Sequence, residues 1–341
     1  MNSNLKEPLL ILTVGGLGDL LCSEPVIRYG LKEVFTKSEE ILIVIKEPLI
    51  FSHFLKNPRL RLISEEELYK DIKSYIGYSV CATYEHPLFT KKGLIQGAMH
   101  STDYASVYLL GRLIPETCKK IYIDPPTESE IYHVVEKFKN LGLHPHETFL
   151  IHPGETWPSR TIPAEWWEEF IKEYKKPVCL IGQHRPKDVP LMTESPSKIP
   201  DHTDEPHRDY VPGVLDLNCK VPSLIDQLSF RELVTAIYLC KGIITNDSVP
   251  VHIAGAFDNY LFTFATAREW FNLRPYDHFY SYNFATDCYY PAVHFRPTKL
   301  IGSVDLIPEN SWETFYGLKP DIKNIILSPK SAARTIERLW N

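Results

Sequence analysis

The chain has 341 residues, of which 44% are apolar and 23% are charged, and its formal net charge is −6. This length favours two domains, and the composition is that of an ordinary globular protein. The negative charge excludes an overall electrostatic attraction to nucleic acid or to an anionic membrane, although it is compatible with a local basic patch.

Seven cysteines are scattered along the chain without a CxxC pair. This distribution favours a reduced, cytoplasmic protein over a disulfide scaffold. The amino-terminal segment lacks the pattern of a signal peptide, and no apolar stretch is long enough to span a bilayer. We therefore expect any membrane contact to be peripheral.

Short apolar segments alternate with helical patterns in the first half of the chain. Residues 9–14 are predicted to form a buried strand, followed by a glycine loop and a helix over 20–34. Further strands are predicted at 41–45, 59–63, 78–83 and 121–123, with helices at 65–75 and 104–113. This alternation indicates a parallel sheet with right-handed crossovers.

A second alternating half follows a helix predicted over 128–141, which Thr127 would cap and Gly142 would end. Strands are predicted at 149–152, 178–181, 242–245 and 260–264, with helices at 164–174, 230–240, 249–256 and 331–339. The pattern predicts an α/β fold of two Rossmann-like, doubly wound domains. Their predicted bounds are 1–143 and 147–328, and a final helix at 329–341 would pack back on the first domain.

The glycine loop at 15–19 lies at the carboxyl end of the first strand, where open α/β sheets bind ligands. It is not a dinucleotide fingerprint, because the frame that starts at Gly16 would need a glycine where Leu21 stands. The glycines allow a tight turn and a close backbone approach. Asp19 has two interpretations: a cap of the following helix, or a general base facing a cleft between the domains.

Two loops of the second half have the composition of a phosphate site. Segment 151–166 combines a Pro153-Gly154 turn, hydroxyl side chains and the fixed cation Arg160 before a helix, which together can hold a diphosphate. Segment 245–256 runs from a strand into a helix with Pro250 near its first turn. In this segment, Asp247 and Ser248 are suited to cap the helix, and His252 lies one turn inside it.

These loops together resemble the pattern of glycosyltransferase family 9, typified by ADP-heptose:lipopolysaccharide heptosyltransferases. The matching residues are Gly15, Gly18 and Asp19, then Arg160 with Pro163, then Asp247, Ser248, His252 and Ala256. The resemblance implies a GT-B fold, in which two facing Rossmann-like domains enclose a cleft. Residues 1–143 would form the acceptor side, and residues 147–328 would bind a nucleotide sugar.

The resemblance further implies an inverting, metal-independent transfer of a sugar from a nucleotide-diphosphate sugar to a hydroxyl of a glycan or glycolipid. Asp19 would be the catalytic base. The donor would be bound by Gly154, Thr156, Arg160, Asp247, Ser248 and His252, while Gly15, Gly16 and Gly18 would shape the first loop. No cofactor and no metal are expected, because the nucleotide sugar is itself a co-substrate.

The chain departs from the family pattern at Ser248-Val249, where the family has Thr-Gly, and at Arg160, where the family has lysine. Its aromatic segment 270–290 also differs from the heptosyltransferases. These aromatic side chains would either stack on a ligand or pack in the protein interior. The polar segment 184–212 contains His184, Asp201, His202, Asp204, Glu205 and His207. Their spacing matches no standard metal-ligand set, so a solvated loop is favoured.

Two alternative functions stay open on the sequence alone. One is a GT-B enzyme that glycosylates modified bases in DNA, for which a salt-sensitive activity would be diagnostic. The other is a catalytically inactive module that binds a sugar nucleotide or a glycan. The presence of Asp19, Arg160, Asp247 and His252 argues against the inactive module.

Overall fold

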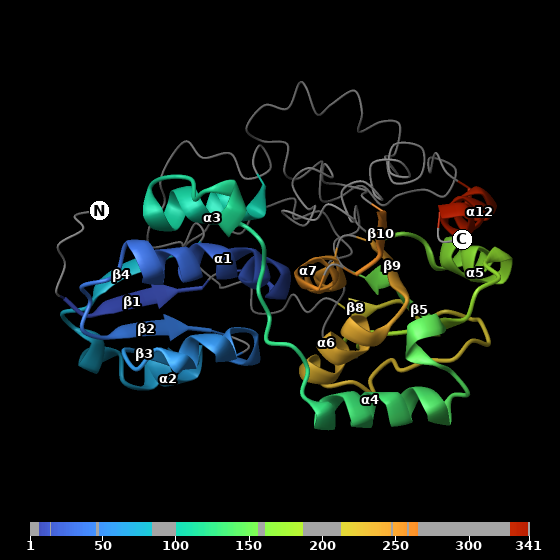
Figure 1. Cartoon of the computed structure of the whole chain (residues 1–341), viewed down its shortest axis with the longest axis horizontal. Helices are drawn as coiled ribbons and strands as arrows, with labels where there is room; N and C mark the ends of the chain where they lie inside the picture. Colours follow the sequence, from blue (N-terminus) through green and yellow to red (C-terminus); the bar gives the residue numbers. More distant parts are fainter. Residues whose placement is uncertain are drawn as a thin grey trace, which may run out of the picture. The chain divides into compact units, whose positions relative to one another are not determined.

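The computed structural model describes residues 7–13, 15–45, 48–83, 100–155, 161–186, 213–246, 248–257, 259–264 and 328–339. These residues form two compact units, which divide between Asp124 and Pro125. Each unit contains a parallel sheet covered by helices (Figure 1).

The described strands of the first unit run in the order β3-β2-β1-β4 and are all parallel. They are β1 (Leu9–Leu12), β2 (Ile41–Val44), β3 (Leu60–Ile63) and β4 (Ser79–Ala82). The chain moves outward from β1 to β3 and then crosses back to pair β4 with β1. This reversal is the Rossmann topology, and it places the topological switch point of the sheet between β1 and β4.

Helices lie on both sides of this sheet. α1 (Leu17–Glu33) and α3 (Ser101–Leu110) pack together on one side, and α2 (Glu65–Lys70) lies on the other (Figure 1). The described residues of this unit also include three 3₁₀ helices: η1 (Pro48–Lys56), η2 (Ile72–Tyr75) and η3 (Glu116–Cys118). Because strands covered on both faces have no polar side, β2 is an unbroken apolar run.

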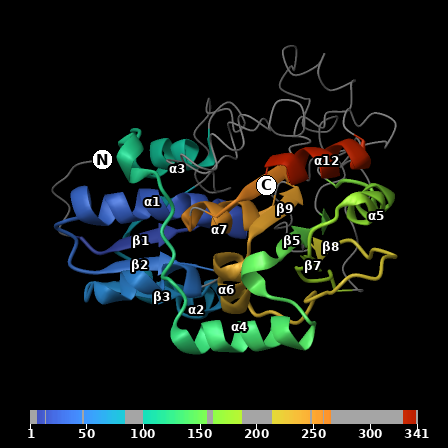
Figure 2. The same cartoon turned by 45° about the vertical axis from the view of Figure 1, so that its right-hand side comes forward.

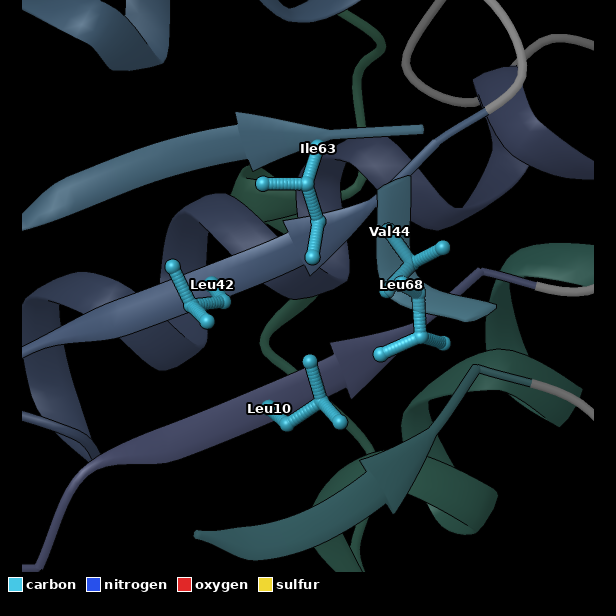
Figure 3. Packing of buried hydrophobic residues seen from close by; sticks show 5 residues of the cluster. All are labelled: Leu10, Leu42, Val44, Ile63 and Leu68. Atoms are coloured by element: carbon cyan, nitrogen blue, oxygen red, sulfur yellow. The ribbon is translucent and has the colours of Figure 1, made fainter. Parts of the chain in front are cut away.

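The sheet face beneath α2 is an apolar core built from alternate strand positions. Figure 3 shows Leu10, Leu42, Val44 and Ile63 from three neighbouring strands packed with Leu68 of α2. The register pairs Leu10 with Leu42 and Val44 with Ile63, which keeps these side chains on one face. Burial of each such side chain stabilises the fold by roughly 1.5–3 kcal/mol.

A buried carboxylate determines the conformation of the segment that ends the first unit. Glu24 of α1 is fully buried and accepts hydrogen bonds from Arg28 Nε at 2.7 Å and from the Tyr122 N–H at 2.8 Å. His53 Nε2 lies 3.1 Å from the same carboxylate. Residues 121–123 were predicted to be a strand, and their alternating burial fits one. The prediction was wrong because Tyr122 donates to a side chain instead of a neighbouring strand.

The second unit has a sheet of the same kind, in which the described strands run β10-β9-β5-β7 in parallel. A parallel bridge between Leu180 and Ser223 continues it beyond β7. The strands are β5 (Phe149–His152), β7 (Val178–Leu180), β9 (Gly242–Asn246) and β10 (Leu261–Phe264). A short antiparallel ribbon joins β6 (Gly154–Glu155) to β8 (Gly213–Val214). The described helices of this unit are α4 (Glu128–Asn140), η4 (Pro145–Glu147), α5 (Ala164–Glu173), α6 (Phe230–Leu239), α7 (Val249–Ala256) and α12 (Pro329–Leu339).

Helix α4 belongs to the second unit, whereas the sequence analysis placed it in the first domain. The predicted cap is confirmed, since Thr127 Oγ1 accepts the Glu130 N–H at 3.3 Å. Val134 and Phe138 are the buried residues of α4, which packs against α6 (Figure 2). Arg231 of α6 also donates to both carboxylate oxygens of Glu130, and this pairing lowers the pKa of Glu130 to about 2. These contacts explain why α4 packs with the second unit.

Helix α12 packs against α5 in the second unit (Figure 2), and its predicted packing on the first domain stays a prediction. Its buried face consists of Ala332, Ala333 and Ile336, and the small alanines allow close approach to α5. Glu337 accepts a hydrogen bond from the Lys175 backbone N–H just after α5. No helix in the described part of the chain is long and apolar enough to cross a membrane.

Candidate functional site

The carboxyl ends of β5 and β9 mark the topological switch point of the second sheet. β5 pairs with β7 on one side and with β9 on the other, and β10 follows β9 outward. In open α/β sheets, ligands bind outside the carboxyl ends of the strands at such a point. Here β5 ends at His152 and β9 ends at Asn246.

The Asn246 side chain connects these two strand ends. Its Oδ1 accepts the Gly154 N–H at 3.0 Å, and its Nδ2 donates to the Gly154 carbonyl at 2.8 Å. Asn246 is fully buried, and a Cβ built on Gly154 would lie 2.6 Å from its Oδ1. Only glycine therefore fits at position 154. The two bonds fix the turn after β5 against the segment that leads from β9 into α7.

His152 fills the space beneath this turn. It is buried, its Nδ1 lies 3.4 Å from Thr245 Oγ1, and a Cβ on Gly154 would meet its Cε1 at 3.0 Å. Burial lowers the pKa of His152 to about 4, so the imidazole is neutral near pH 7. A neutral ring gives the turn steric support without adding charge to the sheet edge.

Helix α7 starts next to this turn. Ser248 occupies the N-cap position in extended conformation, as predicted, but its hydroxyl makes no capping bond. Pro250 lies in the first turn, and His252 is buried further along the helix. The amino-terminal end of a helix carries a partial positive charge and attracts anions. Three residues predicted to bind the donor here, Thr156, Arg160 and Asp247, lie outside the described residues.

The glycine loop of the first unit leads from β1 into α1. Gly16 is the N-cap of α1, and its N–H donates to Asp19 Oδ2 at 3.1 Å. Gly15 has a φ of +102°, and a Cβ there would lie 2.6 Å from the same oxygen. Gly18 lies in the first helical turn. The capping interpretation of Asp19 therefore describes its observed contact, and its role as a base stays a prediction.

Residues 182–186 contain a histidine that the sequence analysis considered for a metal site. The His184 imidazole lies between Asp226, at 2.6 Å from Nδ1, and Asp216, at 2.8 Å from Nε2. Its hydrogen bond to Asp226 raises the pKa of His184. Within the described ranges, no group of three or more histidine, cysteine or acidic side chains is placed to hold a metal ion. The other candidates, from Asp201 to His207, lie outside those ranges, as does the aromatic segment 270–290.

The structure brings Gly154 together with Asn246 and His152, two residues that the sequence analysis did not select. Both have a signal in the sequence, because each is a polar residue at the end of a buried strand. Such positions lie at the ligand-binding edge of a parallel sheet. The motifs of the sequence lie in the loops that follow, so they do not identify the strand ends.

No protein-family model matches the sequence, and comparison with curated proteins gives no match. Solved structures do match. A family 9 glycosyltransferase from Veillonella parvula DSM 2008 is similar at a TM-score of 0.62 and 14% identity, over 98% of this chain and 97% of that chain. ADP-heptose LPS heptosyltransferase II from E. coli is similar at a TM-score of 0.54 and 13% identity, over 98% of both chains.

A third similar structure is the dodecameric, iron-containing heptosyltransferase TibC from enterotoxigenic E. coli, solved in complex with ADP-D-β-D-heptose. Its TM-score is 0.53 at 11% identity, over 98% of this chain and 76% of that chain. At these identities the likenesses show the fold. The chain has the α/β fold of the GT-B heptosyltransferases, as predicted from the sequence.

We predict that His152 makes the second unit sensitive to acid. Its pKa is about 4 when folded and about 6.5 when unfolded. Between these values the unfolded chain binds more protons, so the free energy of unfolding should fall as pH drops from about 6.5 to 4. The loss is about 3 kcal/mol. Urea unfolding at pH 7, 5 and 4 should show a smaller loss in His152→Asn than in the wild type.

The exposed His133 of α4 provides the control, because its side chain lies at the surface of the same unit. His133→Asn should keep the wild-type pH dependence. Equal acid losses in His152→Asn and the wild type would contradict the buried, neutral state of His152.

Proposed function

We propose that the chain is an inverting, metal-independent glycosyltransferase of the cytoplasm that moves a sugar from a nucleotide-diphosphate sugar to a hydroxyl of a glycan or glycolipid. The bonds between Asn246 and Gly154 carry this proposal, because they build a rigid turn at the switch point of a sheet with the GT-B fold. Open α/β sheets bind nucleotides at this point.

The second unit would bind the donor. Backbone N–H groups of the turn and the amino-terminal end of α7 can solvate a diphosphate. We assign Thr156, Arg160, Asp247, Ser248 and His252 to the same task, together with Gly154. A guanidinium and a helix dipole supply positive charge at the departing phosphate, and this charge takes the place of a metal ion. TibC, which shares the fold, was solved with ADP-D-β-D-heptose, so ADP-linked sugars are the first donors to test.

The first unit would supply the base. In the proposed step, the acceptor oxygen bonds to the anomeric carbon while the bond from that carbon to the diphosphate oxygen breaks. The diphosphate leaves with the electron pair, and the acceptor proton passes to Asp19. The cap occupies Oδ2 of Asp19, and a carboxylate has a second oxygen that can accept the proton. Capping and catalysis are therefore compatible in one side chain.

The donor class can be identified by thermal stabilisation without added metal, using ADP-, UDP-, GDP-, CDP- and CMP-linked sugars. We expect one class to stabilise the protein by about 2.7 kcal/mol at a concentration near 100 times its Kd, which raises Tm by several degrees. Arg160→Ala should abolish the shift, and Arg334→Ala, on the exposed face of α12, should preserve it. The absence of any shift in the wild type would contradict the proposal.

Asp19→Asn separates catalysis from donor binding. The amide oxygen can still accept the Gly16 N–H, so the donor-induced shift and the stability of the variant should match the wild type. Loss of the base should slow transfer by about 10²–10⁴-fold. The measurement is release of nucleoside diphosphate from the identified donor in the presence of mixed glycan and glycolipid acceptors.

Glu33→Gln, which removes an exposed carboxylate at the other end of α1, should transfer at the wild-type rate. Wild-type turnover in Asp19→Asn would refute the role of this residue as the base. Donor binding without turnover in the wild type would favour an inactive binding module.

A further inference from the structure

Arg185 lies at the same sheet edge as the proposed donor site but belongs to none of the motifs found in the sequence. It follows β7, the strand that pairs with β5 on the side away from β9. Its guanidinium Nη1 is 3.6 Å from Oε2 of Glu155, the residue after Gly154 in β6. Arg185 therefore faces the residue that directly follows Gly154, the residue bonded by Asn246.

The guanidinium of Arg185 is incompletely paired. Its side chain is only 19% exposed, and the contact with Glu155 is longer than a hydrogen bond. The Nε atom is buried without a hydrogen-bond partner among the described residues. Arginine carries five N–H donors in a fixed fork, and a buried donor without an acceptor is unfavourable. An oxyanion bound here would satisfy these donors.

The backbone that presents Arg185 is held in place before any ligand binds. Gly182 has a φ of +128°, and a Cβ there would lie 2.3 Å from Val214 Cγ1. The Gln183 carbonyl accepts the Val214 N–H at 3.0 Å, and the His184 N–H donates to Asp226 Oδ1 at 2.7 Å. A fixed loop needs little ordering on binding, which is the property expected of a ligand-binding position.

Of the two basic side chains in the described part of this loop, Arg185 is the one suited to bind a ligand. The His184 imidazole is paired on both nitrogens, with Asp216 and Asp226, so both of its ring nitrogens are already occupied by carboxylates. Arg185 faces one carboxylate at long range, from Glu155. In the described part of this loop, residues 182–186, the cationic N–H groups that lack a hydrogen-bond acceptor therefore belong to Arg185.

From this geometry we propose that Arg185 binds an oxyanion of the nucleotide-sugar donor through its guanidinium fork. The inference rests on the proposed function and adds a specificity-determining residue to the same site. Two sources provide the same chemistry: the diphosphate of any donor, or the carboxylate of an acidic sugar. Both present a pair of oxygen atoms that a guanidinium can bind in bidentate fashion.

Isothermal titration of the wild type and Arg185→Ala with defined probes tests the inference. The diphosphate probes are pyrophosphate, ADP, UDP, GDP and CDP, and the sugar probes are UDP-glucuronate and UDP-glucose. We expect Arg185→Ala to weaken binding about 10- to 100-fold. Weakening of every diphosphate that the wild type binds assigns the diphosphate. Weakening of UDP-glucuronate alone assigns the sugar carboxylate.

Equal affinities of Arg185→Ala and the wild type for all bound probes would overturn the inference and leave the proposed function intact. A wild type that binds none of the probes would overturn both. Glu155→Gln distinguishes ligand binding from a structural ion pair: if Arg185 served only that pair, both variants would lose stability alike and neither would lose affinity. Arg185→Lys keeps the charge without the fork and should bind with intermediate affinity, and Arg334→Ala should bind as the wild type does.

Discussion

The paired hydrogen bonds between the Asn246 carboxamide and the Gly154 backbone are the interaction on which the rest of the candidate site depends. They join two neighbouring strand ends, so the turn after β5 and the start of α7 are held at a fixed spacing. His152 supports the turn from beneath as a neutral ring, and Glu155 extends the same turn towards Arg185. Loss of either bond would leave a buried backbone group of Gly154 without a partner, which costs free energy. This cost favours the paired arrangement even before a ligand binds.

Two carboxylates of α1 in the first unit lie in different surroundings. Asp19 lies at the exposed amino-terminal end, where it receives one N–H and keeps a second oxygen for chemistry. Glu24, fully buried less than two turns later, receives bonds from Arg28 and from the Tyr122 backbone. The buried residue fixes the segment that leads to the unit boundary, while the half-buried residue remains accessible for proton transfer. Burial and hydrogen-bond partners therefore assign these similar side chains to structure and to proposed catalysis.

Local patterns in the sequence predicted most of the fold, because the apolar strands and the capped helix α4 are determined by nearby residues. The packing partners of α4 and α12 were not predicted, since amphipathic periodicity identifies the buried face of a helix without identifying the element that covers it. Residues 121–123 were assigned to a strand from their apolar sequence, and the side chain that replaces a strand partner, Glu24, is almost a hundred residues away. Arg185 could not be found from a motif, because its significance lies in the donors that the fold leaves unpaired.

Donor affinity of Asn246→Ala is the most direct measurement of the central claim. The variant leaves the Gly154 N–H and carbonyl unpaired, so we expect about 2–4 kcal/mol lower stability and donor binding about 10- to 100-fold weaker. The titration uses the nucleotide sugar that stabilises the wild type, at a temperature where circular dichroism shows the variant folded. Asn218→Ala, at an exposed position of the same unit, should bind as the wild type does. A folded Asn246→Ala with wild-type affinity would contradict the claim that this interaction builds the donor site.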